Sequence, residues 1–167
     1  MDAIMNRRST RKYLDRPVED DKLERILRAA MQSPTGHNSQ EWDFIVVRDP
    51  DRRRAVSEMG PFSHFAAAAP LLLVVLADLE RAWAEAPLWP SDMGAVCQTI
   101  LIQTEEEGLG ACWMGVWPHE DRELYLRELL GIPGTVVPCA VISLGYKEFQ
   151  KRFDDRYDPG KVHWETY

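Results

Sequence analysis

Apolar residues recur along this chain at spacings that predict helices and buried strands. The first helical pattern places apolar side chains at positions i, i+3, i+4 and i+7, on one face of a helix: Leu23, Ile26, Leu27 and Ala30. Asp20 and Asp21 precede this pattern, where the helix dipole favours negative charge. The pattern therefore predicts an amphipathic helix that ends before Pro34.

Four more helices are predicted along the chain. They cover residues 1–6 (one or two turns), 51–59 (short and charged), 91–108 and 120–130. The third is the longest, with Ser91 suited to the N-cap and Gly108 suited to the position after the C-cap. Gly131 ends the fourth in the same way.

Four runs of apolar and β-branched residues predict strands. They cover residues 42–47, 71–77, the second part of 108–115, and 136–144. The run 71–77 is apolar at every position, which is typical of a strand buried on both faces. Pro138 cannot donate a ladder hydrogen bond, so it predicts an edge or starting position for the last strand.

Two segments show neither the apolar spacing of a helix nor the apolar run of a strand. Residues 146–167 are polar and aromatic, which predicts an extended arm, and such an arm is unusual unless it lies along another surface. Residues 78–90 contain Trp83 and Trp89 between charged residues and prolines. They predict either a lid over a pocket or a surface connection, and the sequence leaves both open.

Composition narrows the function classes. The length of 167 residues and the hydrophobic content of 45% predict a single domain that spans residues 1–167. The net charge of −7 argues against nucleic-acid binding, because phosphate contacts need a positive surface. The longest apolar run, Ala66–Ala77, contains Pro70 and is too short to cross a membrane.

The three cysteines stand far apart in apolar sequence. This placement predicts reduced core residues of a cytoplasmic protein, with no disulfide framework and no metal site. They are Cys97, Cys112 and Cys139.

One segment concentrates positive charge in this acidic chain. Asn6–Tyr13 holds four of the 20 basic residues: Arg7, Arg8, Arg11 and Lys12. The guanidinium fork suits bidentate binding of phosphate or carboxylate, and Ser9 adds a hydroxyl donor. The segment predicts a site for one discrete anion, such as a phosphate-bearing small molecule, while a solvated run of charge remains the alternative.

Two other segments could complete such a site. Ser33–Trp42 is rich in small and amide residues that suit the hydrogen-bonding edge of a heterocycle, although an ordinary helix-to-strand connection has the same composition. Arg156 could supply a second basic group, or could be a surface arginine among aspartates. The glycines of 108–115 are not a dinucleotide fingerprint, because Trp113 replaces the third glycine and a helix precedes them.

Five motifs occur in an order that resembles the nitroreductase family of FMN-dependent NAD(P)H oxidoreductases. They are Arg7–Arg11, Pro34–Gln40 with Trp42, Gly108–Gly115, Leu129–Pro133, and Gly145–Tyr146 with Asp155–Trp164. The resemblance covers nearly the whole chain. It implies an α+β fold with helices around a central mixed β-sheet, and an intertwined homodimer with FMN at the subunit interface. The arm, residues 146–167, would reach the partner subunit.

The resemblance also implies a set of cofactor-binding residues. The phosphate, ribityl and pyrimidine side of FMN would be held by Arg7, Arg8, Ser9 and Arg11, with Arg156 returning to the phosphate. The loop of the other subunit would contribute Pro34, Thr35, Gly36 and Asn38, and Gln40 of this loop is also expected to bind the cofactor. The ring would lie near Trp113, Met114 and Gly115, with a backbone N–H around Met114–Gly115 facing flavin N5.

Three positions depart from the family pattern. Thr35 stands where the family usually has Ser, and it keeps the hydroxyl. Glu41 stands where Pro is usual and adds a charge beside the loop. Asp154 stands where a Lys often precedes the closing Arg, so phosphate binding by the arm would depend on Arg156, with possible help from Arg152. FMN affinity is the property that these departures affect.

The resemblance implies a function without catalytic side chains. The flavin would pass hydride from NAD(P)H through N5 to a small electron acceptor, such as a nitroaromatic, a quinone or a flavin, by ping-pong turnover. A fixed cation, Arg8 or Arg11, would favour the reduced flavin. Two other functions stay open: a sensor or carrier that binds FMN or another phosphorylated ligand without turnover, and an arginine-rich docking arm for a polyanionic partner.

Overall fold

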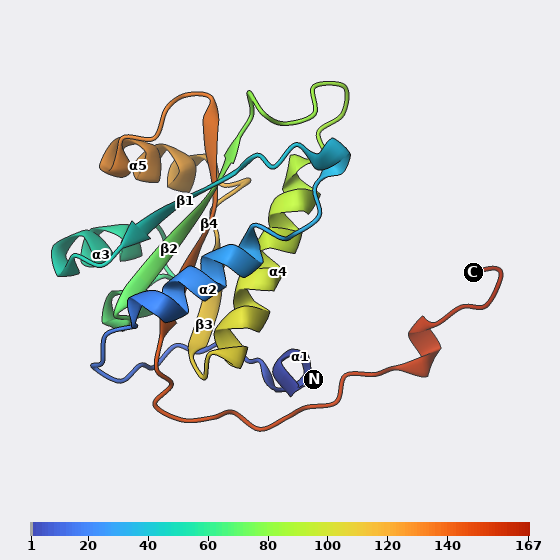
Figure 1. Cartoon of the computed structure of the whole chain (residues 1–167), viewed down its shortest axis with the longest axis horizontal. Coiled ribbons are helices and arrows are strands. Elements are labelled where there is room, and N and C mark those ends of the chain that lie inside the picture. The colour runs from blue at the N-terminus through green and yellow to red at the C-terminus, as the bar shows by residue number, and fades with distance from the viewer. Residues whose placement is uncertain (1) are drawn as a thin grey trace.

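A four-stranded sheet forms the centre of the molecule. The computed structural model describes residues 2–167 (Figure 1). The strands are β1 (Trp42–Val47), β2 (Leu71–Asp78), β3 (Gly110–Gly115) and β4 (Val136–Gly145), in the order β1-β2-β4-β3. All three pairings between neighbouring strands are antiparallel.

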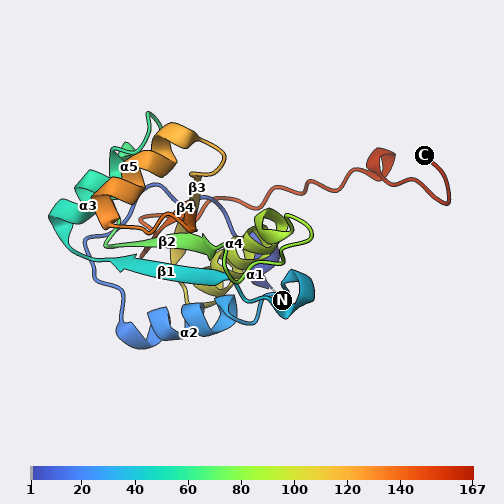
Figure 2. The same ribbon diagram turned by 90° about the horizontal axis from the view of Figure 1, so that it is seen from above.

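Helices cover both faces of this sheet, which confirms the α+β class. The α-helices are α1 (Asp2–Asn6), α2 (Asp20–Ala30), α3 (Pro50–Ser57), α4 (Trp89–Glu106) and α5 (Glu120–Leu130). Three short 3-10 helices are η1 (Gly36–Asn38), η2 (His64–Ala68) and η3 (Pro159–Lys161). Figure 2 shows α2 on one side of the sheet and α3 with α5 on the other. Met1, the first residue of the helix expected at 1–6, lies outside the described residues.

The sheet pairing differs from the mixed sheet that the resemblance implied. Among residues 2–167, the parallel pairing is confined to an isolated bridge between Ser9 and Ala111. The apolar run of β2 did not reveal this difference, because an antiparallel strand covered by helices on both faces is as apolar as a buried parallel strand.

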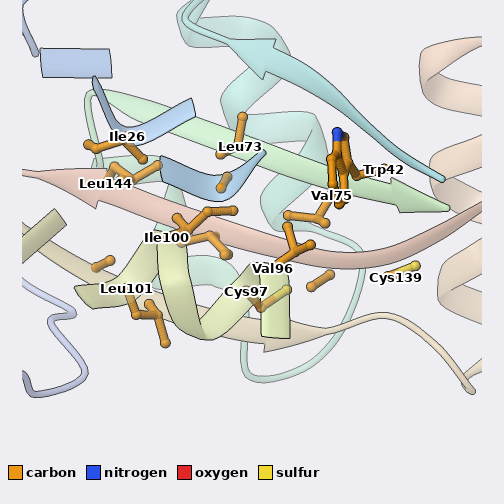
Figure 3. Packing of buried hydrophobic residues seen from close by; sticks show 14 of the residues in the cluster. Ile26, Trp42, Leu73, Val75, Val96, Cys97, Ile100, Leu101, Cys139 and Leu144 are labelled. Atoms are coloured by element: carbon orange, nitrogen blue, oxygen red, sulfur yellow. The ribbon is translucent and has the colours of Figure 1, made fainter. Parts of the chain in front are cut away.

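Side chains of β2 alternate between two hydrophobic cores. Leu73 and Val75 belong to the core shared with α2 and α4, whereas Leu72 and Val74 belong to the core shared with α3 and α5. Figure 3 shows the first core, in which side chains of α2 and α4 meet those of the sheet. Both faces of β2 are therefore buried, as the sequence predicted.

The pairing of β4 bears on the expectation from Pro138. β4 lies between β2 and β3 in the centre of the sheet, and all ten of its residues are buried. Pro138 pairs with Leu76 where the register of β2 shifts between Val75 and Leu76. Within residues 2–167, β3 pairs with β4 from Ala140 to Gly145, so Pro138 lies in the first part of β4, where β2 is the partner strand and the other side has no ladder. The expected edge or starting position is therefore confirmed for this part of the strand.

The N-terminus of α4 also corrects an expectation. The helix begins at Trp89 with Leu88 as its N-cap, so Ser91 lies inside the first turn and its Oγ donates to the Leu88 carbonyl at 2.7 Å. Pro90 suits this first turn because its missing N–H would have no helical partner there. Gly108 has a φ of +73°, in the left-handed region that follows many helices.

Acidic residues at the end of α4 are neutralised by other elements. Arg25 Nη2 of α2 lies 2.9 Å from Glu107 Oε2, and this hydrogen bond lowers the pKa of the Glu107 carboxyl. Lys147 Nζ lies 2.7 Å from Glu105 Oε1. Lys22 Nζ donates to the Glu107 carbonyl oxygen, where the helix dipole favours a cation. These pairs offset the unfavourable position of the acids.

The final 20 residues form an extended arm. Every residue from Glu148 to Tyr167 is exposed, and η3 is the regular element within it. Figure 1 shows this segment running away from the sheet and helices. Its large exposed apolar side chains are Phe149, Phe153, Tyr157, Val162, Trp164 and Tyr167.

The three cysteines are free and buried, as predicted. Burial raises the pKa of Cys97 to about 12. Among residues 2–167, no helix has both the length and the apolar character needed to cross a membrane.

We expect Ile100→Ala to lower the free energy of unfolding by about 2–5 kcal/mol and Ile100→Val by about 0.5–1.5 kcal/mol. Ile100 is fully buried between α2, α4 and the sheet, so truncation leaves a cavity. Urea unfolding at one fixed protein concentration measures both changes. Leu124→Ala is the control, because Leu124 is 59% exposed. Equal effects of Ile100→Ala and Leu124→Ala would contradict this description of the core.

Candidate functional site

The arginine-rich segment lies along the outer edge of β3. The Thr10 N–H donates to the Ala111 carbonyl at 2.8 Å, next to the bridge between Ser9 and Ala111. Gly110 permits this close approach, because a Cβ atom there would lie 2.4 Å from Thr10 Oγ1. Tyr13 holds the other end of the segment, since its hydroxyl donates to the Thr10 carbonyl at 2.7 Å.

A cavity of about 380 Å³ gathers the N-terminal arginines and the arm. Arg7, Arg8 and Ser9 line it together with Arg156, whereas Arg11, which was expected at the same site, does not. The Arg7 Nε atom is buried and has no hydrogen-bond partner among residues 2–167. A buried guanidinium nitrogen of this kind favours an anionic ligand, because an unpaired buried donor is costly.

Acidic residues of the arm share this cavity. Asp154 and Asp155 line it, and Arg156 Nε lies 3.6 Å from Asp154 Oδ2. Arg8 donates from Nη1 to the carbonyls of Met5 at 2.9 Å and Arg7 at 2.7 Å, which fixes its orientation. The departure at Asp154 therefore places a carboxylate that competes with an anionic ligand for Arg156.

A second cavity, of about 480 Å³, lies against β3 and the segment between α3 and η2. We call it the ring cavity. Its lining residues are Arg11, Met59, Gly60, Phe62, Ser63, Phe65, Cys112, Trp113, Met114, Gly115 and Arg122. The Arg11 guanidinium lies 5.6 Å from the centre of the Phe65 ring. The N-terminal segment thus contributes cations to both cavities.

The thiol of Cys112 also faces this region. Burial raises the pKa of Cys112, while the nearby charge of Arg11 acts in the opposite direction. The thiol is therefore neutral at pH 7 and contributes an apolar wall.

Some backbone groups of β3 point outward from the edge of the sheet, where Cys112–Gly115 line the ring cavity. Ala111 and Gly115 direct their carbonyls outward from the sheet, since they accept from the Thr10 N–H and from Arg122 Nη1. Backbone groups alternate in direction along an antiparallel strand, so the N–H of Gly115 points to the same edge, whereas Met114 bonds to β4. Of the N–H groups of Met114 and Gly115, that of Gly115 is therefore the one that points outward from the sheet.

The amide loop, residues 34–40, has an unusual backbone. His37, Asn38 and Gln40 have φ angles of 54°, 56° and 50°, in a region that non-glycine residues rarely occupy. Its hydrogen bonds include two from backbone N–H groups to side chains: the Gly36 N–H donates to Asp92 Oδ2 at 3.0 Å, and the Gln40 N–H donates to Thr35 Oγ1 at 3.1 Å. The hydroxyl of Thr35 therefore has a structural role here.

The side chain of Glu41 supports this loop from the interior of the protein. Its side chain is fully buried, and Oε2 accepts from Ser39 Oγ at 2.6 Å. Ser39 Oγ also lies 2.9 Å from the Gly36 carbonyl. The charge that departs from the family pattern is thus directed into the protein, away from the exposed side of the loop.

Residues 78–90 hold the amide loop in place. The rings of His37 and Trp83 stack with centroids 3.6 Å apart and planes 9° apart. Arg81 Nη1 donates to the Gln40 carbonyl at 3.2 Å, and Gly36 packs so closely on Leu88 that a Cβ atom would lie 2.5 Å from Leu88 Cδ1. These contacts brace the loop, while Trp89 and Pro90 of the same segment line a further cavity beside Trp113. The lid and the surface connection both stay predictions.

The structure does not bring the whole predicted site together in one chain. None of the expected loop residues (Pro34, Thr35, Gly36, Asn38 and Gln40) lines the two cavities. Figure 1 shows η1 beside one end of α4 and α1 beside the other end. An α-helix of 18 residues is roughly 27 Å long, so one chain cannot close the loop over its own arginines.

Comparison with known proteins identifies the chain. The model of the nitroreductase family matches residues 4–60 and 59–146. The chain belongs to the nitroreductase family. An Archaeoglobus fulgidus protein with the provisional name NADH dehydrogenase/NAD(P)H nitroreductase is 41% identical over 167 residues, which are 98% of this chain and 96% of the relative.

Solved structures of this family share the fold over the whole chain. A Clostridium acetobutylicum protein provisionally called an NADH oxidase superposes with a TM-score of 0.96 and 38% identity, over 99% of this chain and 100% of the other. An FMN-dependent nitroreductase from Clostridium difficile superposes with a TM-score of 0.92 and 32% identity, over 100% of both chains.

Several lining residues of this nitroreductase were not predicted. Phe62 is 86% exposed and lies beside Ser63 and Phe65 in the ring cavity. A Gly-Pro pair followed by two phenylalanines marked a turn with exposed aromatic residues, but no periodic pattern linked it to β3. Arg122 was also missed, although a cation in the acidic first turn of α5 is unusual.

We expect Trp83→Ala to speed amide hydrogen exchange in the loop. The lost stacking on His37 is worth about 0.5–1.5 kcal/mol, so exchange at residues 36–40 should be about 2–10 times faster. Mass spectrometry after pepsin digestion measures this rate. Trp164→Ala is the control, because Trp164 is 82% exposed in the arm. Unchanged exchange in Trp83→Ala would show that residues 78–90 do not brace the loop.

Proposed function

We propose that this chain is an FMN-dependent oxidoreductase that transfers hydride from NAD(P)H to a small-molecule electron acceptor. Membership of the nitroreductase family and the name of the Clostridium difficile structure support both the cofactor and the reaction class. The single observation that carries the assignment is structural. Residues 7–11 line two cavities: the one that also includes Arg156, which we call the anion cavity, and the ring cavity. A phosphorylated ring compound needs both, one for its phosphate and one for its ring.

The residues of the anion cavity fit a phosphate. Arg7, Arg8 and Ser9 supply donors, and the unpaired buried Nε of Arg7 is the polar atom that a phosphate oxygen would satisfy. Arg156 adds a fourth donor group but is paired with Asp154. We infer that Arg7, Arg8 and Ser9 contribute more to phosphate binding than Arg156 does.

The ring cavity fits a flat, electron-accepting ring. Phe65, Met114 and Trp113 supply apolar surface, Gly115 supplies an outward N–H, and Arg11 supplies positive charge. Bound FMN supplies the hydride chemistry at its ring. The residues of this chain orient the ring, exclude water from one face and stabilise negative charge through Arg11.

Two sets of predicted residues require a second subunit. We infer that the amide loop of one subunit completes the cavities of its partner, because it is held rigidly at the far end of α4 from its own arginines. The exposed aromatic side chains of the arm would lie on that partner. Residues 1–167 would then form one domain that swaps its arm within a homodimer.

A sensor or carrier that binds FMN without turnover is the alternative function. The names of the relatives favour an enzyme, because they describe reductases and oxidases. The ring cavity remains open beside Phe62, which leaves room for an acceptor.

We expect the purified protein to show a flavin absorbance band that bleaches on anaerobic addition of NADH or NADPH. Arg11→Ala should weaken FMN binding at least about tenfold, because it removes a cation from the ring cavity. Titration of apoprotein with FMN, followed by fluorescence quenching, measures this change.

Lys12→Ala is the matched control for this experiment. Lys12 is exposed, adjoins Arg11 and lines neither cavity. A flavin band that does not bleach would favour the sensor, and no uptake of FMN by the unaltered chain would refute the proposed function. Equal effects of the two variants would refute the role of Arg11.

We expect sedimentation equilibrium to give a mass of roughly twice 19.2 kDa for the flavin-loaded protein. Removal of residues 158–167 should weaken the dimer and keep Arg156, because it deletes only the exposed end of the arm. A monomer that still holds FMN would contradict the two-subunit site.

A further inference from the structure

Arg122 is a cation of the ring cavity that no family motif includes. It belongs to the first turn of α5, on the opposite side of the cavity wall from the N-terminal segment that carries Arg11. Arg122 Nη1 donates to the Gly115 carbonyl at 2.7 Å. A Cβ atom on Gly60 would lie 3.1 Å from Arg122 Nε, so the guanidinium lies between Gly60 and the end of β3.

The charge of Arg122 is not used in an ion pair. Within residues 2–167, no carboxylate lies within 4.0 Å of its nitrogens, although Glu120, Asp121 and Glu123 surround it on α5. Its position opposes the helix dipole, which disfavours a cation in the first turn. The contact with Gly115 is the hydrogen bond of its side chain within residues 2–167, and a guanidinium carries five N–H donors in all.

We propose that Arg122 is a positioning residue of the ring cavity that favours the reduced form of the bound ring. It acts in two ways. Its hydrogen bond fixes the carbonyl group of Gly115, the residue whose N–H points to the same edge of β3, and its positive charge attracts the negative charge that a ring gains on reduction. This inference rests on the proposed function, because it concerns the cofactor assigned to the same cavity.

The charge can act because the cavity is only partly open to water. Arg122 is partly buried, and Met59, Phe65 and Met114 form much of the surrounding wall. A charge beside such apolar walls is screened less than a charge on an open surface. Arg11 and Arg122 therefore place two unpaired cations around one cavity in a chain with a net charge of −7.

The test measures the affinity of the protein for oxidised and reduced FMN. Arg122→Met keeps the length of the stem beside Gly60 and removes the charge and the hydrogen bond. Arg122→Lys restores the charge. The midpoint potential of the bound flavin, measured by equilibration with reference dyes, gives the ratio of the two affinities without any turnover.

We expect Arg122→Met to lower the preference for reduced over oxidised FMN about tenfold, which corresponds to a fall of about 30 mV for a two-electron couple. Arg122→Lys should recover at least half of this shift on a logarithmic scale. The control is Arg54→Met, which makes the same change of net charge on α3, outside the ring cavity. Its preference should stay within about twofold of the unaltered protein.

Each result separates this inference from the proposed function. A wild-type protein that binds FMN and bleaches with NAD(P)H, together with an unchanged potential in Arg122→Met, would overturn the role of Arg122 alone. An equal shift in Arg54→Met would also overturn it, because the effect would then come from net charge. A wild-type protein without FMN would refute the proposed function itself.

Discussion

The hydrogen bond from Thr10 to Ala111 determines where the chemistry of this chain can occur. It joins the arginine-rich segment to the edge of β3, so a local cluster of charge becomes one wall of a site built on the sheet. A free N-terminal segment of this composition would be a solvated run of charge. Once paired with the strand, it presents Arg7 and Arg8 to one cavity and Arg11 to the next. Cations that are close together in the sequence therefore line two different cavities.

The arrangement of the other strands and helices leaves β3 at the edge of the sheet. β4 lies in the centre of the sheet with Pro138 at an irregularity, so β3 is left as an edge strand. α4 supports the inner side of β3, and its acidic end is held by Arg25 and Lys147. These contacts support β3 from its inner side. Ligand-binding groups gain precision when they are held by regular elements in this way.

Local patterns in the sequence predicted most elements but not their neighbours in space. The spacing of Leu23, Ile26 and Ala30 defined α2, and the apolar run defined β2, because burial imposes a period that a single chain reveals. The edge or starting position expected from Pro138 was confirmed, because the ladder between β3 and β4 begins only at Ala140. Strand order depends on contacts between distant segments, which no local period encodes.

The residues of the candidate site were also predicted where they are close in the sequence and missed where they are distant. The cations and the glycines of β3 were predicted from motifs that are contiguous in the chain. Phe62, Ser63 and Arg122 were not, because they come from separate elements and meet only in the folded protein. The separation of the amide loop from the arginines could not be predicted from one chain either, since it depends on the length and direction of α4.

The outward groups at the end of β3 have a consequence for the solution behaviour of the chain. An unpaired strand edge is a template on which another chain can extend a sheet. Ser9 and Thr10 pair with the first part of this edge, while at the other end Arg122 donates to the Gly115 carbonyl. A ring bound there would also shield the edge from intermolecular pairing. Ligand-free protein is therefore the form most open to aggregation through β3, and recognition and solubility depend on the same few peptide groups.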